Sequence, residues 1–205
     1  MPRTLLIATH NPGKVAEYRA LLADLPLEIT FLTELGIDDE VEETEPTFEE
    51  NAILKARYFA QRTGLWTWAD DSGLEVDVLG GRPGVESARY AGPDASDEDR
   101  YRKLLAELLE HPHEPWTARF RCVVAIAQPD GKVATRSGEL EGIITDQPRG
   151  EYGFGYDPIF YLPDFEATLA ELHPDVKNNI SHRAEAAAKA KELLIEMLLE
   201  AEGNE

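Results

Sequence analysis

The stretch LLIATHNPGKVAEYRALL, residues 5–22, decides the fold. Its apolar run at 5–9 is typical of a short buried strand, and residues 15–22 carry apolar side chains at helical spacing. Between them, Asn11 is a good N-cap, and Pro12 suits the first helical position because its missing N–H costs nothing there. The stretch therefore predicts a strand, a tight turn and a helix in immediate succession.

Strand-like and helix-like segments continue to alternate along the chain. Strands are predicted at 28–32, 66–69, 119–128 and 132–138, the last two joined by the hairpin turn Pro129-Asp130-Gly131. Helices are predicted from the capping box of Thr47 and Glu50 to about residue 62, at 97–109, and from a Ser181 cap to about residue 199. Residues 79–92 are rich in Gly and Pro and predict a loop. The alternation predicts an α/β fold with a mixed sheet, in a single domain covering residues 1–205.

The composition limits the possible partners. The chain has 205 residues with 40 Asp and Glu against 20 Lys and Arg, a net charge of −20, and 42% of it is hydrophobic. That hydrophobic content suffices for a buried core, whereas the acidic excess argues against a nucleic acid or an anionic membrane as partner. The single cysteine, Cys122, excludes an internal disulfide and lies in an apolar run. The apolar run at 5–9 is too short for a secretory signal, so we expect a cytoplasmic protein.

The turn Thr9-His10-Asn11-Pro12-Gly13-Lys14 is the first candidate for chemistry. A helix N-terminus presents N–H groups and the positive end of the helix dipole, which attract phosphate, and Lys14 adds a full charge. The pattern is not a P-loop, because no glycine stands five positions before a Gly-Lys pair. The alternative is an ordinary capped helix with a solvated lysine.

Two acidic segments are candidates for binding a metal ion. Residues 38–50 hold eight acids and no base, which predicts either a solvated loop or, if several acids converge, a Mg²⁺ site shared with substrate phosphates. Asp70-Asp71-Ser72-Gly73 follows the predicted strand at 66–69, and the glycine would allow a sharp turn there. Successive strand residues point to opposite faces, so only one of the two aspartates can face a given site. Burying acids is costly unless each finds a partner, which favours metal binding or proton transfer over a simple turn.

Two further segments could recognise a planar ligand. In Gly153-Phe154-Gly155-Tyr156-Asp157-Pro158 the glycines give an aromatic ring room to lie flat on a base, and Asp157 could accept a hydrogen bond from a ring N–H. A tight turn packed into the core is the alternative. His182 and Arg183 follow Ser181 in the first turn of a predicted helix, where cations oppose the dipole. With Lys177, they are therefore expected to face something negative or carbonyl-bearing.

Together these motifs resemble the inosine triphosphate pyrophosphatase family over residues 5–187. The match rests on the 9–14 turn, on Thr47-Phe48-Glu49-Glu50-Asn51-Ala52 with Lys55, on residues 69–74 and 153–158, and on Ser181-His182-Arg183. The resemblance implies Mg²⁺-dependent hydrolysis of non-standard purine nucleoside triphosphates (dITP/ITP, XTP/dXTP) to the monophosphate and pyrophosphate, which cleanses the nucleotide pool. It also implies an elongated mixed β-sheet flanked by helices, two lobes with a central active-site cleft, and a homodimer.

The resemblance also implies a role for each matched residue. Those expected to hold the triphosphate are Thr9, His10, Asn11, Pro12, Gly13 and Lys14, assisted by Lys55. The implied metal-side carboxylates are Glu43 and Asp71, and Asp71 is also the implied proton acceptor. Other implied substrate contacts are Ser72, Phe154, Gly155, Tyr156, Asp157, Lys177, His182 and Arg183. Removal of Arg183 is expected to abolish most ITP turnover while the fold survives. His10 departs from the residue that bacterial relatives often carry.

Two rival functions remain open from the sequence. The related Maf-like pyrophosphatases act on other nucleotides, and preference for dTTP or UTP over ITP would favour them. A non-catalytic nucleotide-binding protein is the second rival. The Asp70-Asp71 pair and the acidic stretch argue against it, because a mere binder gains little from negative charge beside a triphosphate.

Overall fold

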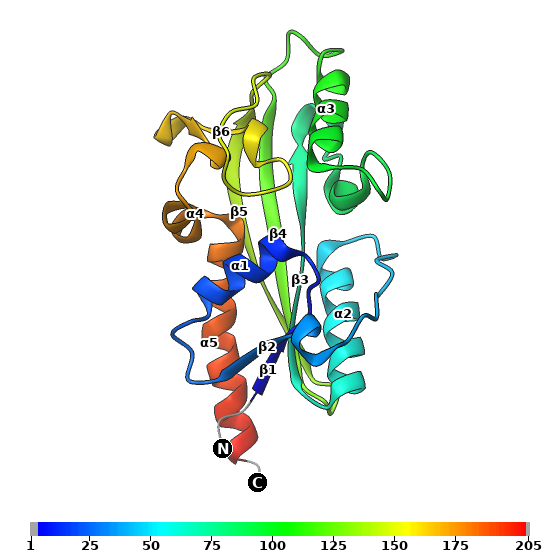
Figure 1. The fold of residues 1–205 in the computed structure, drawn as a ribbon, viewed down its shortest axis with the longest axis vertical. Helices are drawn as coiled ribbons and strands as arrows, with labels where there is room; N and C mark the ends of the chain where they lie inside the picture. The colour runs from blue at the N-terminus through cyan, green and yellow to red at the C-terminus, as the bar shows by residue number, and fades with distance from the viewer. Residues whose placement is uncertain (1–3, 204–205) are drawn as a thin grey trace. The chain divides into compact units, whose positions relative to one another are not determined.

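A computed structural model of the chain describes residues 4–203, which form a mixed sheet flanked by helices (Figure 1). The strands run in the hydrogen-bonded order β2-β1-β3-β4-β5-β6-β7, where β1 pairs in parallel with β2 and β3, and β6 pairs antiparallel with β5 and β7. Their bounds are β1 Thr4–Ile7, β2 Glu28–Phe31, β3 Trp66–Val76, β4 Thr117–Ala127, β5 Val133–Ile144, β6 Phe160–Leu162 and β7 Ala167–Thr168. The α-helices are α1 Pro12–Leu21, α2 Phe48–Thr63, α3 Asp97–Leu108, α4 Pro174–Ile180 and α5 His182–Gly203. The predicted α/β class with a mixed sheet is confirmed.

The chain forms two compact units, each built from separate stretches of sequence. Unit 1 comprises residues 1–71, 122–138 and 183–205, and unit 2 comprises residues 72–121 and 139–182. Three of the boundaries fall within long strands, so β3, β4 and β5 each contribute residues to both units. The ends of the predicted domain, residues 1–3 and 204–205, lie outside the described residues.

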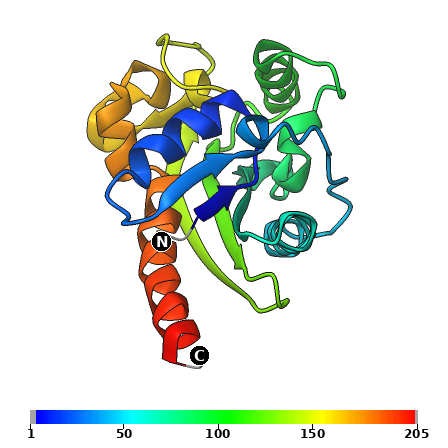
Figure 2. The same ribbon diagram turned by 60° about the horizontal axis from the view of Figure 1, so that its bottom comes forward.

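In unit 1 the sheet carries a hydrophobic core on each face. Leu5 and Ile7 of β1 pack with side chains of α1 and α5, whereas Leu6 packs with Ala56 and Phe59 of α2. This alternation is what the period-2 geometry of a strand produces when both faces are apolar. Figures 1 and 2 show α5 and α2 on opposite sides of β1 and β3.

The helix starts in unit 1 follow the predicted capping. The Asn11 side chain caps α1 by accepting hydrogen bonds from the N–H groups of Gly13 at 2.8 Å and Lys14 at 3.1 Å. Thr47 caps α2 by accepting from the Glu50 N–H at 3.2 Å. The predicted hairpin also forms, because the Gln128 N–H donates to the Lys132 carbonyl at 2.8 Å where β4 turns into β5.

Unit 2 has one core, formed by strand residues such as Leu74, Val76 and Phe120 together with Leu104 and Leu108 of α3. Leu74 and Val76 show that the predicted end of the third strand at residue 69 is wrong. The strand runs through Asp70 and Asp71 to Val76, because the apolar residues beyond the acids are buried in this core.

Other boundaries also differ from the predictions. β5 extends to Ile144, beyond the predicted end at 138, and α4 was not predicted. The segment 79–92 is less irregular than expected, because it contains the 3-10 turn Gly84–Arg89 after a cis peptide bond between Arg82 and Pro83. Within the described part of the chain, no helix has both the length and the apolar character that a membrane crossing requires.

Candidate functional site

Asp70 and Asp71 lie side by side on β3 and face opposite sides of the sheet in unit 1. Their neighbours show this alternation, since Trp68 packs in the core beneath α1 and α5 and Ala69 packs in the core beneath α2. By the same period, Asp70 faces the side of α1 and α5, and Asp71 faces the side of α2. The inference that the two aspartates serve different faces is therefore confirmed.

On the α1 side, Asp70 is the centre of a buried ionic cluster. Its Oδ2 lies 2.9 Å from the Lys14 Nζ and 3.5 Å from two nitrogens of Arg183, and its side chain is 1% exposed. Burial opposes ionisation, but the charges of Lys14 and Arg183 outweigh it and hold the pKa of Asp70 far below its usual range. Asp70 is therefore a permanent carboxylate that orients two cations.

Arg183, the second residue of α5, has its guanidinium between two carboxylates of unit 1. Its Nη1 donates to the Glu17 Oε2 at 2.6 Å, and its other nitrogens face Asp70. Burial lowers the pKa of Arg183, but Glu17 and Asp70 raise it well above the usual value, so the guanidinium stays charged. Sequence reasoning expected a negative partner for this cation, and the structure supplies two from the protein itself.

On the α2 side, Lys55 gathers both predicted metal-side carboxylates. Its Nζ pairs closely with Glu43, lies 3.7 Å from the Asp71 Oδ1, and donates to the Asp70 carbonyl at 2.6 Å. Burial raises the pKa of Asp71, Lys55 lowers it, Glu43 raises it again, and the net direction is upward. Glu43 and Asp71 come from distant segments of the chain, and both thus lie beside the positively charged Lys55.

The donor set on this side consists of carboxylates, which suit a hard divalent cation. In residues 4–203, no three His, Cys, Asp or Glu side chains gather closely enough to hold a metal by themselves. Mg²⁺ prefers one or two carboxylates together with substrate phosphate oxygens, and Glu43 and Asp71 supply those two carboxylates. The acidic stretch does not converge as a whole, since Asp39, for example, pairs with Arg62 at 3.0 Å.

The 9–14 turn differs from the prediction in its hydrogen bonding. The Asn11 side chain accepts from the Gly13 and Lys14 N–H groups, and the Asn11 N–H donates to the Thr9 Oγ1 at 3.2 Å. The expectation of free N–H groups at this helix start is therefore wrong for Gly13 and Lys14. A good N-cap satisfies the donors that a phosphate would otherwise take. The dipole of α1 can still attract an anion, and Lys14 lies at the same helix start with its Nζ paired to Asp70.

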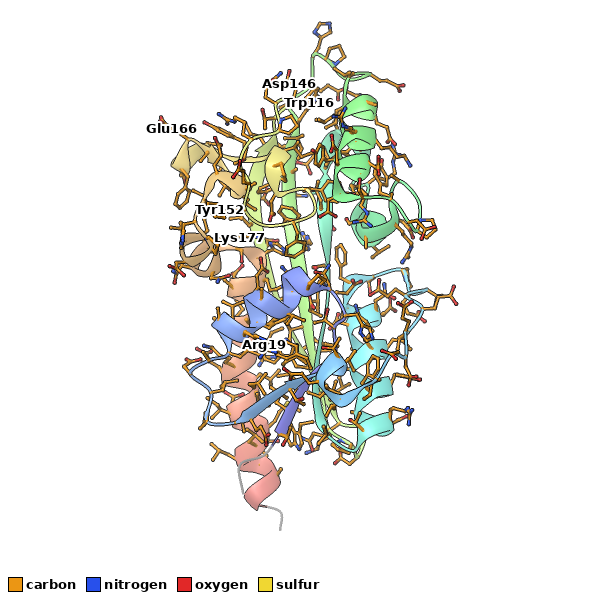
Figure 3. The ribbon with its side chains drawn as sticks, in the orientation of Figure 1. Arg19, Trp116, Asp146, Tyr152, Glu166 and Lys177 are labelled. Atoms are coloured by element: carbon orange, nitrogen blue, oxygen red, sulfur yellow. The ribbon has the colours of Figure 1, made fainter. Side chains whose placement is uncertain are left out.

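In unit 2, the 153–157 segment forms a tight turn around Asp157. The Asp157 Oδ2 accepts from the Phe154 N–H at 2.9 Å and pairs with the Nζ of Lys177, which is labelled on α4 in Figure 3. The same Nζ lies 4.8 Å from the centre of the Phe154 ring. Gly153 has φ +75°, and a Cβ there would lie 2.0 Å from the Asp157 Oδ2, so only glycine fits. Phe154 and Asp157, predicted in one motif, and Lys177, predicted in another, therefore form one cluster.

Two further predicted residues, His182 and Ser72, belong to unit 2. Within unit 2, the His182 ring stacks on Phe120 with centroids 4.7 Å apart and an interplanar angle of 11°. Ser72 follows Asp71 on β3. Sequence reasoning missed Glu17, because its partner Arg183 lies 166 residues away in the sequence.

Comparisons with known proteins identify the family of this chain. The family model described as "Ham1 family" matches residues 5–193. The dITP/XTP pyrophosphatase of Bacillus subtilis is 51% identical over 92% of this chain and 96% of its own, and that of Geobacter sulfurreducens is 52% identical over 93% and 96%. The solved structure of a HAM1 protein from Coxiella burnetii superposes with a TM-score of 0.86 at 43% identity, covering 95% of this chain and 99% of that one. This chain belongs to the Ham1 family.

Proposed function

We propose that this protein is a metal-dependent nucleoside triphosphate pyrophosphatase. It hydrolyses non-standard purine nucleoside triphosphates, dITP/ITP and XTP/dXTP, to the monophosphate and pyrophosphate, and so cleanses the nucleotide pool. The observation that carries the proposal is the pair of ionic clusters on the two faces of β3, one around Asp70 and one around Lys55. The names of the relatives, dITP/XTP pyrophosphatases, give the substrate class.

The reaction requires little covalent work from the protein. Cleaving a triphosphate depends on neutralising its oxygens and orienting a water molecule. Lys14, at the positive end of the α1 dipole, and Lys55 would neutralise part of the negative charge on the triphosphate oxygens. The rest of the 9–14 turn would surround the phosphates, with the Asn11 side chain rotating away to release the Gly13 and Lys14 N–H groups.

Glu43 and Asp71 would hold the Mg²⁺ ion, which would supply charge neutralisation at the phosphate oxygens when bound. Asp71 would also accept the proton of the attacking water. Without the metal, burial and the nearby Glu43 raise the pKa of Asp71 although Lys55 lowers it, and bound Mg²⁺ would oppose this rise and favour the ionised carboxylate that accepts a proton. Lys55 holds the two carboxylates together before substrate arrives.

The proposed products require the anhydride bond between the α- and β-phosphates to break, which attack at either phosphorus would achieve, and we assign the attack to the α-phosphorus. Hydrolysis in ¹⁸O-labelled water tests this assignment. The label should appear in the monophosphate, and label found only in pyrophosphate would reject it.

Substrate contacts are assigned to Ser72, Phe154, Gly155, Tyr156, Asp157, Lys177, His182 and Arg183, as the resemblance implies. Hypoxanthine and xanthine carry a 6-oxo acceptor where adenine carries an amino donor. A donor from His182, or from Arg183 if it gave up a contact with Glu17 or Asp70, would meet the oxo group well, but it would leave a donor facing a donor with adenine. Such a mismatch can discriminate by ~10³-fold or more.

A pyrophosphate-release assay across ITP, XTP, dITP, GTP, ATP and dTTP, with and without Mg²⁺, tests the proposal. Turnover should favour ITP, dITP and XTP and should require the metal. Preference for dTTP would favour the Maf-like alternative, and binding without turnover would favour a non-catalytic binder. The homodimer, the central cleft and the cytoplasmic location stay predictions.

A further inference from the structure

The 153–157 turn of unit 2 is held by a side chain that no motif indicated. The Gly155 N–H donates to the Asp97 Oδ2 at 2.7 Å, across 58 residues of sequence. The other carboxylate oxygen of Asp97 accepts from the Arg100 Nη1, also at 2.7 Å. A hydrogen bond from a backbone N–H to an ionised carboxylate is stronger than one between neutral groups.

Asp97 is not needed to start its own helix. Ser96 is the N-cap of α3, because its Oγ accepts from the Asp99 N–H at 3.1 Å. The Asp99 carboxylate returns the bond by accepting from the Ser96 N–H at 2.9 Å, which completes a capping box. Asp97 occupies the first helical position, and its carboxylate is directed to the Gly153–Asp157 turn instead.

This contact fixes the middle of the turn. Gly155 stands between Phe154 and Tyr156 and has φ +65°, a conformation that needs glycine. The flanking residues have their own anchors, since the Phe154 N–H donates to Asp157 and the Tyr156 hydroxyl donates to the Ser87 carbonyl at 2.9 Å. Asp97 adds a third anchor, because it accepts a hydrogen bond from the Gly155 N–H between the other two.

We propose that Asp97 is a positioning residue for purine recognition: it holds the Gly153–Asp157 turn in the conformation that presents Phe154 and Asp157 to the base. This inference rests on the proposed function, in which that turn contacts the substrate. The Asp97 side chain is 44% exposed, so its loss should weaken recognition by about tenfold, the low end of the range for hydrogen bonds to charged groups.

Glu98 provides a matched control. It is also an acid in the first turn of α3, and it pairs with Arg102 within the helix as Asp97 pairs with Arg100. Replacing either acid by alanine therefore removes one favourable charge at the helix N-terminus and one ion pair within the helix. Of the two changes, Asp97→Ala alone also removes the contact with Gly155.

The first test measures hydrogen exchange of the Gly155 amide by NMR. Asp97→Ala should speed this exchange by about tenfold or more, whereas Glu98→Ala should leave it within about twofold of wild type. Equal exchange in the two variants would overturn the proposal. This readout does not depend on any enzymatic activity, so it remains decisive if the proposed function fails.

The second test separates base recognition from triphosphate binding. Asp97→Ala should raise the KM for ITP by about tenfold with kcat nearly unchanged, because a contact used equally in ground and transition states has been loosened. Inhibition by inorganic tripolyphosphate should be unaltered, since the 9–14 turn and Lys55 belong to unit 1. Asp97→Asn keeps an oxygen acceptor for Gly155 and should fall between alanine and wild type. The positioning role would be refuted if Asp97→Ala weakened ITP binding and tripolyphosphate inhibition alike. It would also be refuted if Asp97→Ala and Glu98→Ala raised the KM for ITP equally. Failure of the wild-type protein to hydrolyse ITP or XTP would instead refute the proposed function.

Discussion

For Arg183→Ala, the structure leads to a different expectation from the sequence. The sequence led us to expect lost ITP turnover in an intact fold. The side chain, however, is 2% exposed and bridges Glu17 to Asp70, so it joins the start of α5 to α1 and β3 within unit 1. We now expect a loss of stability together with the loss of turnover.

The magnitude follows from which groups lose a partner. Glu17 loses a hydrogen bond of 2.6 Å from a charged donor, while Asp70 keeps Lys14 at 2.9 Å. Breaking a buried ion pair by removing one member costs about 3–5 kcal/mol. For a chain of this size that corresponds to roughly a 6–20 °C fall in Tm, at about 2–4 °C per kcal/mol.

Urea unfolding followed by circular dichroism would measure the change in unfolding free energy, with Arg19→Ala as the control. Arg19, labelled in Figure 3, is an exposed arginine on α1 that pairs with the exposed Glu34, and its loss should cost under about 1 kcal/mol. Turnover should be assayed well below the Tm of the variant. If Arg183→Ala were no less stable than Arg19→Ala, the account of a stabilising buried cluster would be wrong.

Two other changes probe separate parts of the molecule. Gly153→Ala puts a Cβ 2.0 Å from the Asp157 Oδ2 at a backbone φ of +75°. We therefore expect thermal unfolding to show about 1–3 kcal/mol of destabilisation, and we expect the KM for ITP to rise. An unaltered KM and Tm would contradict the tight turn. Asp70 has a pKa held below its usual value, so its stabilising effect is present above the unfolded pKa near 3.8 and is lost as the pH falls below it. Asp70→Asn should therefore flatten the dependence of unfolding free energy on pH between about pH 5 and pH 2, and an unchanged slope would refute this assignment.

Local signals in the sequence predicted local structure well. Asn11 and Thr47 were identified as helix caps from residue type and position, and both side chains accept the expected hydrogen bonds. The hairpin at residues 129–131 formed for the same reason, because its turn chemistry is contained in three residues. The mixed α/β sheet followed from the alternation of these elements.

The misplaced strand end shows where such reasoning stops. Asp70 and Asp71 are typical of a turn when only their neighbours are considered. Their partners Lys14, Lys55 and Arg183 come from three other segments, and these ionic contacts allow the strand to continue through both acids. No spacing within the sequence reveals contacts that only the folded sheet creates.

The candidate site was predictable as a set of motifs and less so as a set of contacts. Lys177, Phe154 and Asp157 were expected to face a ligand, and the structure shows that they also contact one another. Asp97 gave no signal because Ser96 and Asp99 already account for the start of α3.

The most direct test of the central claim measures pyrophosphate release from ITP and XTP, with and without Mg²⁺. The wild-type protein and Asp71→Asn are compared, and calorimetry measures nucleotide binding by both. The wild type should release pyrophosphate only with the metal and far more slowly from ATP. Asp71→Asn should lose turnover while still binding nucleotide. Comparable turnover by Asp71→Asn, or release of orthophosphate in place of pyrophosphate, would contradict the account.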